Sequence, residues 1–273
     1  MADPRVFQIG FLSLLLVFGV VARDFGVSWG AVALVMGVVF AIQGIAVGLR
    51  RAPIESLYSA VISGLSVLLL GRAQSVALLC LAAALAIASK FAIRWKGKHF
   101  FNPTNFGILV TILLMGQMWV SPGQWGSDLL IAGWVGVLGL VVVVRSARWD
   151  TAFVFLGAYA FFLAIRVWHL GQSWAVLQHQ LSSGTLIVFA FFMISDPRST
   201  PDDRRARAAF AVGVAALSYH LRFFHQVSAA PLWALLFLSP LTPVLDRIWP
   251  HRRHEWGSST VYLARGILRG RIG

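Results

Sequence analysis

Two short segments stand out because each places polar side chains and a proline beside an apolar run. The first is KHFFNPTNFG, residues 98–107. The side-chain amides of Asn102 and Asn105 can each donate and accept hydrogen bonds along the edge of a heterocycle, and Lys98 can contact a phosphate. Asn102 before Pro103 also suits the start of a helix, where the Asn caps the exposed amides. A ligand site and a capped helix both fit this pattern.

The second segment is SSGTLIVFAFFMISDPRST, residues 182–200. We expect a short helix that begins in the small residues and ends at Asp196–Pro197, where the sequence favours a rigid polar turn. Gly184 and Thr185 would leave room for a planar ligand, and Asp196 would hydrogen-bond it. Ordinary helix packing is the competing interpretation, because Phe and Met fill cores and small residues let helices approach closely.

The composition places these segments in a membrane protein. Hydrophobic residues make up 58% of the 273 residues and charged residues only 12%, against about 25% charged in soluble domains. The basic residues gather at the ends of apolar runs, which indicates membrane topology rather than a nucleic-acid partner. Cys80 is the only cysteine, and four of the seven histidines, His169, His179, His220 and His225, lie near the predicted outer face. We therefore expect no metal site, haem or iron–sulfur cluster.

Charge-free apolar runs predict an all-α fold of about ten transmembrane helices, several of them short for a bilayer. The predicted spans are Phe7–Ala22, Trp29–Leu49, Leu57–Leu70, Ala73–Ala88, Phe106–Val120, Leu129–Val144, Thr151–Ile165, Gly184–Ile194, Ala208–Tyr219 and Val227–Leu245.

The basic residues predict the orientation of these spans. With the N-terminus inside, 19 of the 23 Lys and Arg residues fall on the cytoplasmic side, and the other four, at positions 23, 72, 166 and 222, fall outside. Both termini are then cytoplasmic. We expect one membrane domain over residues 1–250, with two five-helix halves as an option, and a basic tail over residues 251–273. No Asp or Glu lies in the middle of a span, which argues against a stand-alone ion pump.

The two polar segments resemble the paired signatures of RnfD, from the Rnf electron-transport complex, and of NqrB, from the sodium-translocating NADH:quinone oxidoreductase. The resemblance extends to their order, their spacing and the ten-helix plan. It implies a non-covalent flavin, riboflavin or FMN, toward the cytoplasmic side. Carried onto this chain, the flavin site would comprise Asn102, Asn105 and Asp196, with Thr104, Gly184, Thr185, Thr200 and Lys98 as neighbours.

The resemblance also implies a second flavin, an FMN esterified to a Thr in an outer loop. The matching loop is GQWGSDL, residues 123–129, in which Ser127 stands at the Glu position of the family and Asp128 at the Thr position. A carboxylate cannot replace the Thr hydroxyl as the phosphoester acceptor, so we predict no covalent FMN, with Ser127 as a weak alternative attachment. The sequence SPGQWG also resembles a stand-alone branch of this family, which includes a membrane protein found with enediyne biosynthesis genes.

These features favour a bacterial inner-membrane, flavin-binding redox protein that acts as an electron-transfer subunit rather than as a complete enzyme. Its partners would be the lipid bilayer, a quinone and a redox partner protein. Two other functions stay open on the sequence: a transporter or carrier without redox chemistry, and a structural membrane partner of a biosynthetic complex.

Overall fold

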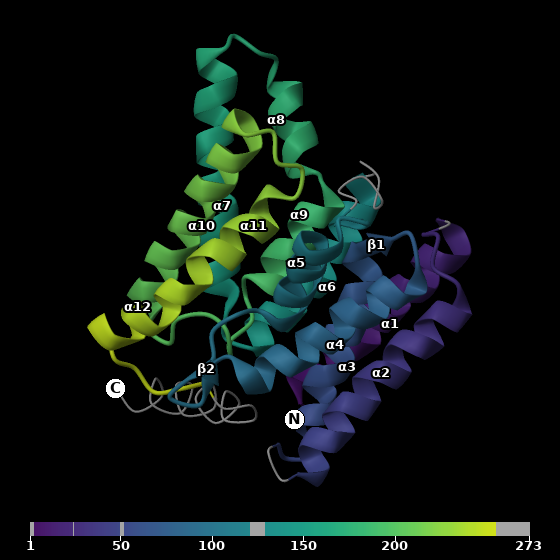
Figure 1. Cartoon of the computed structure of the whole chain (residues 1–273). Helices are drawn as coiled ribbons and strands as arrows, with labels where there is room; N and C mark the ends of the chain where they lie inside the picture. The colour runs from purple at the N-terminus through teal and green to yellow at the C-terminus, as the bar shows by residue number, and fades with distance from the viewer. Residues whose placement is uncertain (1–2, 24, 50–51, 121–128, 255–273) are drawn as a thin grey trace, which may run out of the picture.

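The computed structural model describes residues 3–23, 25–49, 52–120 and 129–254, and most of them form a bundle of helices (Figure 1). The helices are α1 Pro4–Ala22, α2 Trp29–Gly48, α3 Ser56–Leu70, α4 Val76–Ala92, α5 Pro103–Met115, α6 Leu129–Arg145, α7 Trp149–His169, α8 Trp174–Leu181, α9 Gly184–Val188, α10 Arg204–Phe224, α11 Ala230–Leu238 and α12 Thr242–Ile248. A π-helix, η1 Phe189–Met193, continues α9, and a 3₁₀ turn, η2 Ser239–Leu241, joins α11 to α12.

Two small antiparallel ladders join the ends of helices. Strand β1, Gly71–Ala73, pairs with β4, Met118–Val120, beyond the ends of α3 and α5. Strand β2, Arg94–Trp95, pairs with β3, Lys98–His99, between α4 and α5. The turn between β2 and β3 has positive φ at Lys96 (48°) and Gly97 (82°), as two-residue hairpin turns of the primed type require.

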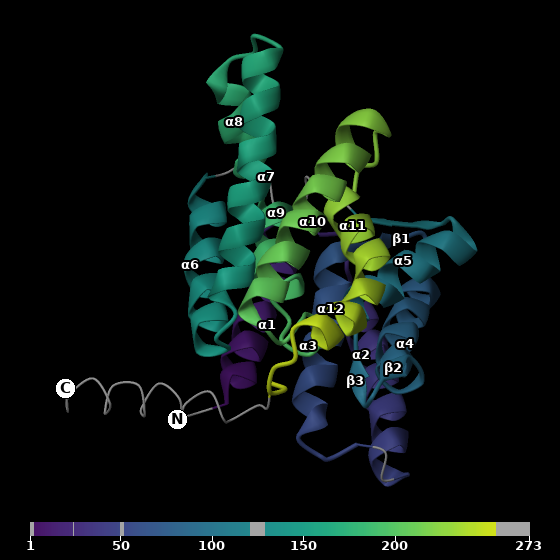
Figure 2. The ribbon, with the colours of Figure 1, turned by 90° about the vertical axis from the view of Figure 1, so that its left-hand side faces the viewer.

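Successive helical runs alternate in direction, so that most links lie at one of two ends of the bundle (Figures 1 and 2). We call the end at which α1, α3, α5, α7 and α10 begin the basic end. Arg5 donates there to the backbone oxygen of Glu55 at 2.9 Å, which joins the starts of α1 and α3. At the opposite end, the Arg72 guanidinium lies 5.0 Å from the centroid of the Phe25 ring.

Each of the ten predicted apolar segments contains helix, as expected for an all-α membrane protein. Among the described residues, three helices (α1, α2 and α7) are long and apolar enough to cross a membrane by themselves. A fourth candidate is the pair formed by α8 and the run Gly184–Met193, which is bent by 52°. The number of spans and the cytoplasmic position of the termini stay predictions.

The structure corrects two predicted spans and adds a helix that was not predicted. Helix α5 ends at Met115 rather than Val120, because Gly116 takes a left-handed conformation (φ 66°) and the chain continues as β4; Gly is the usual residue for such a helix end. The run Val227–Leu245 is broken into α11, η2 and α12 near Pro240 and Pro243, since Pro interrupts a continuing helix. Helix α8 was not predicted at all.

Close contact between α4 and α5 positions the polar segment that begins α5. A Cβ atom at Gly107 would meet the backbone oxygen of Ala82 and lie 2.9 Å from the Ala86 Cβ atom. The two backbones are therefore too close for any side chain at this point, as in other small-residue contacts between membrane helices.

We predict that Gly107→Ala separates α4 from α5 and costs about 1–3 kcal/mol of folding free energy, as overpacking does elsewhere. The measurement is thermal unfolding of the detergent-purified protein. Gly157→Ala is the matched control, because a Cβ atom there meets nothing within 4 Å, and Ala favours a helix over Gly by about 1 kcal/mol. Equal stability of the two variants would contradict the close contact.

Candidate functional site

Asn102 joins the start of α5 to the π-helix. Its side-chain oxygen accepts a hydrogen bond from the Asn105 backbone NH at 3.1 Å, which confirms the predicted cap. Its Nδ2 donates to the Met193 backbone oxygen at 3.2 Å, at the last residue of η1. Asn102 is 6% exposed, so one side chain ties together the two polar segments that the sequence singled out.

Asn105 and Thr104 are also buried in contact with backbone. Asn105 Nδ2 donates to the Leu232 oxygen in α11 at 2.9 Å. The Asn105 side-chain oxygen is buried and has no hydrogen-bond partner among the described residues. Thr104 donates a long bond, 3.4 Å, to the Ser63 oxygen in α3. A buried acceptor without a donor costs about 1–3 kcal/mol, so Asn105 retains a capacity to bind a donor.

Asp196 organises the turn that follows η1. Its carboxylate accepts from the Arg198 backbone NH at 3.1 Å and from the Ser199 hydroxyl at 2.9 Å. Its backbone oxygen accepts from the Thr200 hydroxyl at 2.8 Å. These bonds form the rigid polar turn that the sequence predicts, although the helix stops at Met193, three residues earlier than predicted.

A small cavity lies between these residues. It has a volume of about 50 Å³, and its walls include Asn102, Thr104 and Asp196 together with Phe191 and Phe192. The structure thus brings three of the predicted flavin residues together. A cavity of this size holds a few water molecules, whereas ligand pockets usually measure about 300–1,000 Å³. A flavin ring does not fit between these residues as they stand.

The other predicted residues lie apart from this cavity. Thr200 is fully buried, and its backbone oxygen accepts from Lys98 at 2.7 Å. Gly184 begins α9 and is buried, toward the end of the bundle opposite the basic end. Thr185 lines a different and larger cavity.

This larger cavity, which we call the far cavity, has a volume of about 580 Å³, within the usual range for ligands. Tyr159 and Phe189 form part of its wall through an aromatic row with Phe155, whose ring centroid lies 5.9 Å from Tyr159 and 5.0 Å from Phe189. Its described lining includes Arg222 and no Asp or Glu. The remaining lining residues are Val120, His179, Gln180, Ser183, Thr185, Leu186, Ser228, Ala229, Pro231 and Leu232.

Of the residues predicted for the flavin site, Thr185 lines the far cavity; the other lining residues were not singled out from the sequence. Tyr159 lies inside the predicted apolar span Thr151–Ile165, and His179 lies near the predicted outer face. Arg222 carried the available signal, because it is one of only four cations on the predicted outer side. Within the described residues no carboxylate pairs with Arg222; its guanidinium lies 5.9 Å from the centroid of the Phe223 ring.

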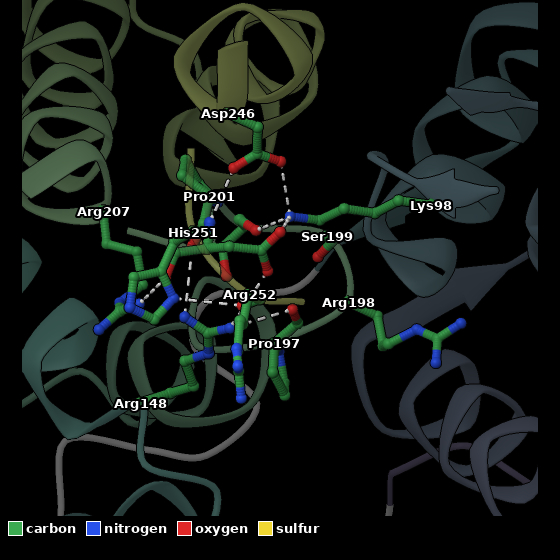
Figure 3. Close-up of polar contacts among 12 residues, drawn as sticks. Lys98, Arg148, Pro197, Arg198, Ser199, Pro201, Arg207, Asp246, His251 and Arg252 are labelled. Atoms are coloured by element: carbon green, nitrogen blue, oxygen red, sulfur yellow. Dashed lines mark hydrogen bonds and ion pairs between the residues drawn. The ribbon is translucent and has the colours of Figure 1, made fainter. Parts of the chain in front are cut away.

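Buried charges form a cluster at the basic end (Figure 3). Lys98 pairs with Asp202 at 3.0 Å and with Asp246 at 2.8 Å. In Figure 3, Asp246 reaches down from α12 and Lys98 reaches in from the right, while Arg148, the residue before α7, lies below them. Arg148 lies 3.7 Å from Asp202. Burial, reinforced by the charge of Arg207, lowers the pKa of Arg148 to about 10, so Arg148 stays cationic at neutral pH.

His99 is a buried titratable group in the same region. It belongs to β3 and is 9% exposed. Burial lowers its pKa to about 4, an effect that the nearby Asp196 carboxylate opposes and the surrounding cations reinforce. His99 is therefore neutral at physiological pH and adds no further positive charge beside the polar turn.

Taken together, the fold is that of a helical membrane protein with a polar junction at one end and a large cavity toward the other. Residues 113–255 match the NQR2, RnfD, RnfE family. The match covers more than half of the 273 residues, and the chain belongs to this family. All the residues that line the far cavity lie within the match, whereas Lys98, Asn102, Thr104 and Asn105 precede it.

Curated relatives agree with this assignment over shorter stretches. The chain is 35% identical over 68 residues to the D-type subunit of the ion-translocating oxidoreductase complex of Stutzerimonas stutzeri, covering 25% of this chain and 19% of the relative. It is 23% identical over 146 residues to the D-type subunit of the proton-translocating ferredoxin:NAD(+) oxidoreductase complex of Clostridium ljungdahlii, covering 52% of this chain and 41% of the relative. The chain thus spans less than half of the length of each.

The loop at which relatives would carry a covalent FMN lies outside the described residues. Ser127 and Asp128 both lie in the segment 121–128, outside the part of the chain that the structure describes. The absence of covalent FMN stays a prediction.

We predict that stability falls as pH decreases through the range in which only the unfolded chain protonates His99. The ordinary pKa of His is about 6.5, and the folded value is about 4. Between these values unfolding takes up a proton, so acid favours the unfolded state. The midpoint temperature of thermal unfolding of the wild type should fall between pH 7.5 and pH 5. The midpoint of the His99→Gln variant should fall less over the same range. Identical pH dependence in the two proteins would contradict a neutral buried His99.

Proposed function

We propose that this chain is a membrane electron-transfer subunit that binds a flavin non-covalently in the far cavity. The observation that carries the proposal is the cavity of about 580 Å³ inside the region that matches the NQR2, RnfD, RnfE family. The curated relatives are named as subunits of ion-translocating oxidoreductase complexes. A complex of that kind is the proposed setting for this chain, with a quinone or a partner protein exchanging the electrons.

The far cavity offers groups suited to a flavin. When bound, a flavin would supply the redox chemistry, and the protein would position it and adjust its potential. Tyr159 and Phe189 would lie against a planar ring, while Thr185 and the other polar lining residues, Gln180, Ser183 and Ser228, would hydrogen-bond its edge or its ribityl hydroxyls. Arg222 would favour negative charge in the cavity, which is the electrostatic condition for holding an added electron or a phosphate.

The junction at Asn102, Asn105 and Asp196 is proposed to support this site rather than to hold the ring. Its cavity of about 50 Å³ is too small for a flavin, and Asn102 is already engaged by Met193. Through Leu232, which accepts from Asn105 and also lines the far cavity, the junction is connected to the proposed flavin site. No covalent attachment is included in the proposal, since Asp128 offers no hydroxyl.

The first test is the cofactor of the purified protein. We expect that protein purified in detergent from flavin-replete cells is yellow and releases free flavin on denaturation, while intact-mass spectrometry gives the mass of the unmodified chain. A reversible redox titration of the bound flavin should follow. Colourless protein that catalyses uptake of a solute would contradict the redox function, and a flavin-modified peptide containing Ser127 would contradict the non-covalent state.

The second test locates the flavin. Arg222→Gln removes a cation from the far cavity and should weaken flavin retention roughly tenfold, as loss of one charge-assisted hydrogen bond does. Arg166→Gln is the matched control, because Arg166 also lies against Phe223, at 4.4 Å from the ring centroid, but does not line the cavity. If Arg222→Gln retains flavin and Asn105→Leu loses it, the ring would instead lie at the junction of Asn102, Asn105 and Asp196.

A further inference from the structure

A third cavity opens at the basic end, where the β2–β3 hairpin faces η2 and α12. We call it the basic groove; it measures about 720 Å³. Trp95 and Phe100 contribute aromatic surface, and Val244 contributes apolar surface from α12. Lys96, Arg247 and Arg253 contribute cations. Nothing in the redox proposal uses this groove.

The cations of the basic groove outnumber its carboxylates. Its two acidic residues are Asp202 and Asp246, and both already pair with Lys98. Asp246 also accepts from the Asp202 backbone NH at 2.8 Å. Lys96, Arg247 and Arg253 are left without a carboxylate partner among the described residues. A groove with unpaired cations at its surface selects an anion.

These cations come from separate parts of the chain and meet across the groove. Lys96 occupies the hairpin turn, Arg247 the last turn of α12, and Arg253 the segment that follows. Arg253 lies against the hairpin, because a Cβ atom at Gly97 would be 3.6 Å from its Nη1 atom. The fold thus converges three cations from separate segments on one opening, as a phosphate group requires.

An apolar strip leads away from the groove. Leu241, Val244 and Ile248 are 46%, 51% and 58% exposed and follow one another at helical spacing. Val244 belongs to both the strip and the groove. Trp95, 56% exposed, lies at the rim, and Trp favours the level of the lipid headgroups. The ligand that matches these surfaces has a phosphate head and an apolar chain.

We infer that the basic groove binds the headgroup of an anionic phospholipid, with an acyl chain along the apolar strip of η2 and α12. Basic pockets at the cytoplasmic side of membrane helices are suited to such headgroups. Residues 255–273, which follow the groove in the sequence, contain one Glu and three Arg. Their net positive charge makes them a poor ligand for a groove lined by cations. Free phosphate would satisfy the cations but would leave the apolar strip uncovered.

The test is thermal unfolding of the full chain in a zwitterionic detergent, titrated with phosphatidylglycerol, phosphatidylcholine or inorganic phosphate. Ligand that binds only the folded chain raises the unfolding midpoint. We expect phosphatidylglycerol to raise it more than phosphatidylcholine does, and phosphate alone to have little effect. The double variant Lys96→Gln/Arg253→Gln should need roughly tenfold more phosphatidylglycerol for the same shift, since each cation near the membrane surface contributes to anionic lipid binding.

Arg205→Gln is the matched control, because Arg205 is an exposed cation at the same end and does not line the groove. It should respond to phosphatidylglycerol as the wild type does. An equal loss in Arg205→Gln would show a general charge effect and overturn the proposal. Equal effects of the two lipids, or a phosphate effect as large as that of phosphatidylglycerol, would overturn it as well.

Discussion

The buried carboxylate of Asp202 is the constraint around which the basic end is arranged. Asp202 is 6% exposed and lies 3.0 Å from Lys98 and 3.7 Å from Arg148. A charge so buried is tolerated only when paired, and removal of one partner from such a pair typically costs about 3–5 kcal/mol. Lys98 comes from the β2–β3 hairpin and Arg148 from the start of α7. The Asp202 side chain therefore holds these two separate segments together.

This arrangement gives the two ends of the molecule different properties. At the basic end, Arg148 donates to the backbone oxygens of Pro197 and Pro201, and Arg207 pairs with Asp150 at 2.6 Å. The turn after η1 is thereby held against the bundle, and the cavity between it and Asn102 is small. Toward the opposite end few charges are present, and the space between α7, α9, α10 and α11 stays open as the far cavity. The far cavity thus lies away from the ion pairs of the basic end, whereas the basic groove lies beside them.

Local features of the structure follow from the sequence more readily than long-range ones. The cap at Asn102 and the helix start at Pro103 were predicted, because both depend on residues within one turn. The β4 strand after Gly116 and the π-helix at Phe189–Met193 were not predicted. A run such as Phe-Ala-Phe-Phe-Met reads as an ordinary helix. The wider i→i+5 bond, from Ile194 NH to the Phe189 oxygen at 3.0 Å, depends on the tertiary surroundings that also bring Asn102 to Met193.

The candidate site, too, was predictable in its local residues but not in its long-range geometry. The resemblance pointed to Asn102, Thr104 and Asp196, and these residues do meet, but no sequence pattern reports the volume left between them. The partner of Asn105, Leu232, lies 127 residues away, and the far cavity is lined by residues from helices that are distant in the sequence, such as α7, α10 and α11. At the junction, Asn102 and Asn105 both donate hydrogen bonds to backbone oxygens, of Met193 and Leu232. π-helical segments recur at functional sites, and here η1 spans the distance between the two, with Phe189 in the wall of the far cavity and Phe191 and Phe192 in the wall of the small one. A ligand in the far cavity would therefore press on the same helical segment that Asn102 holds at its other end.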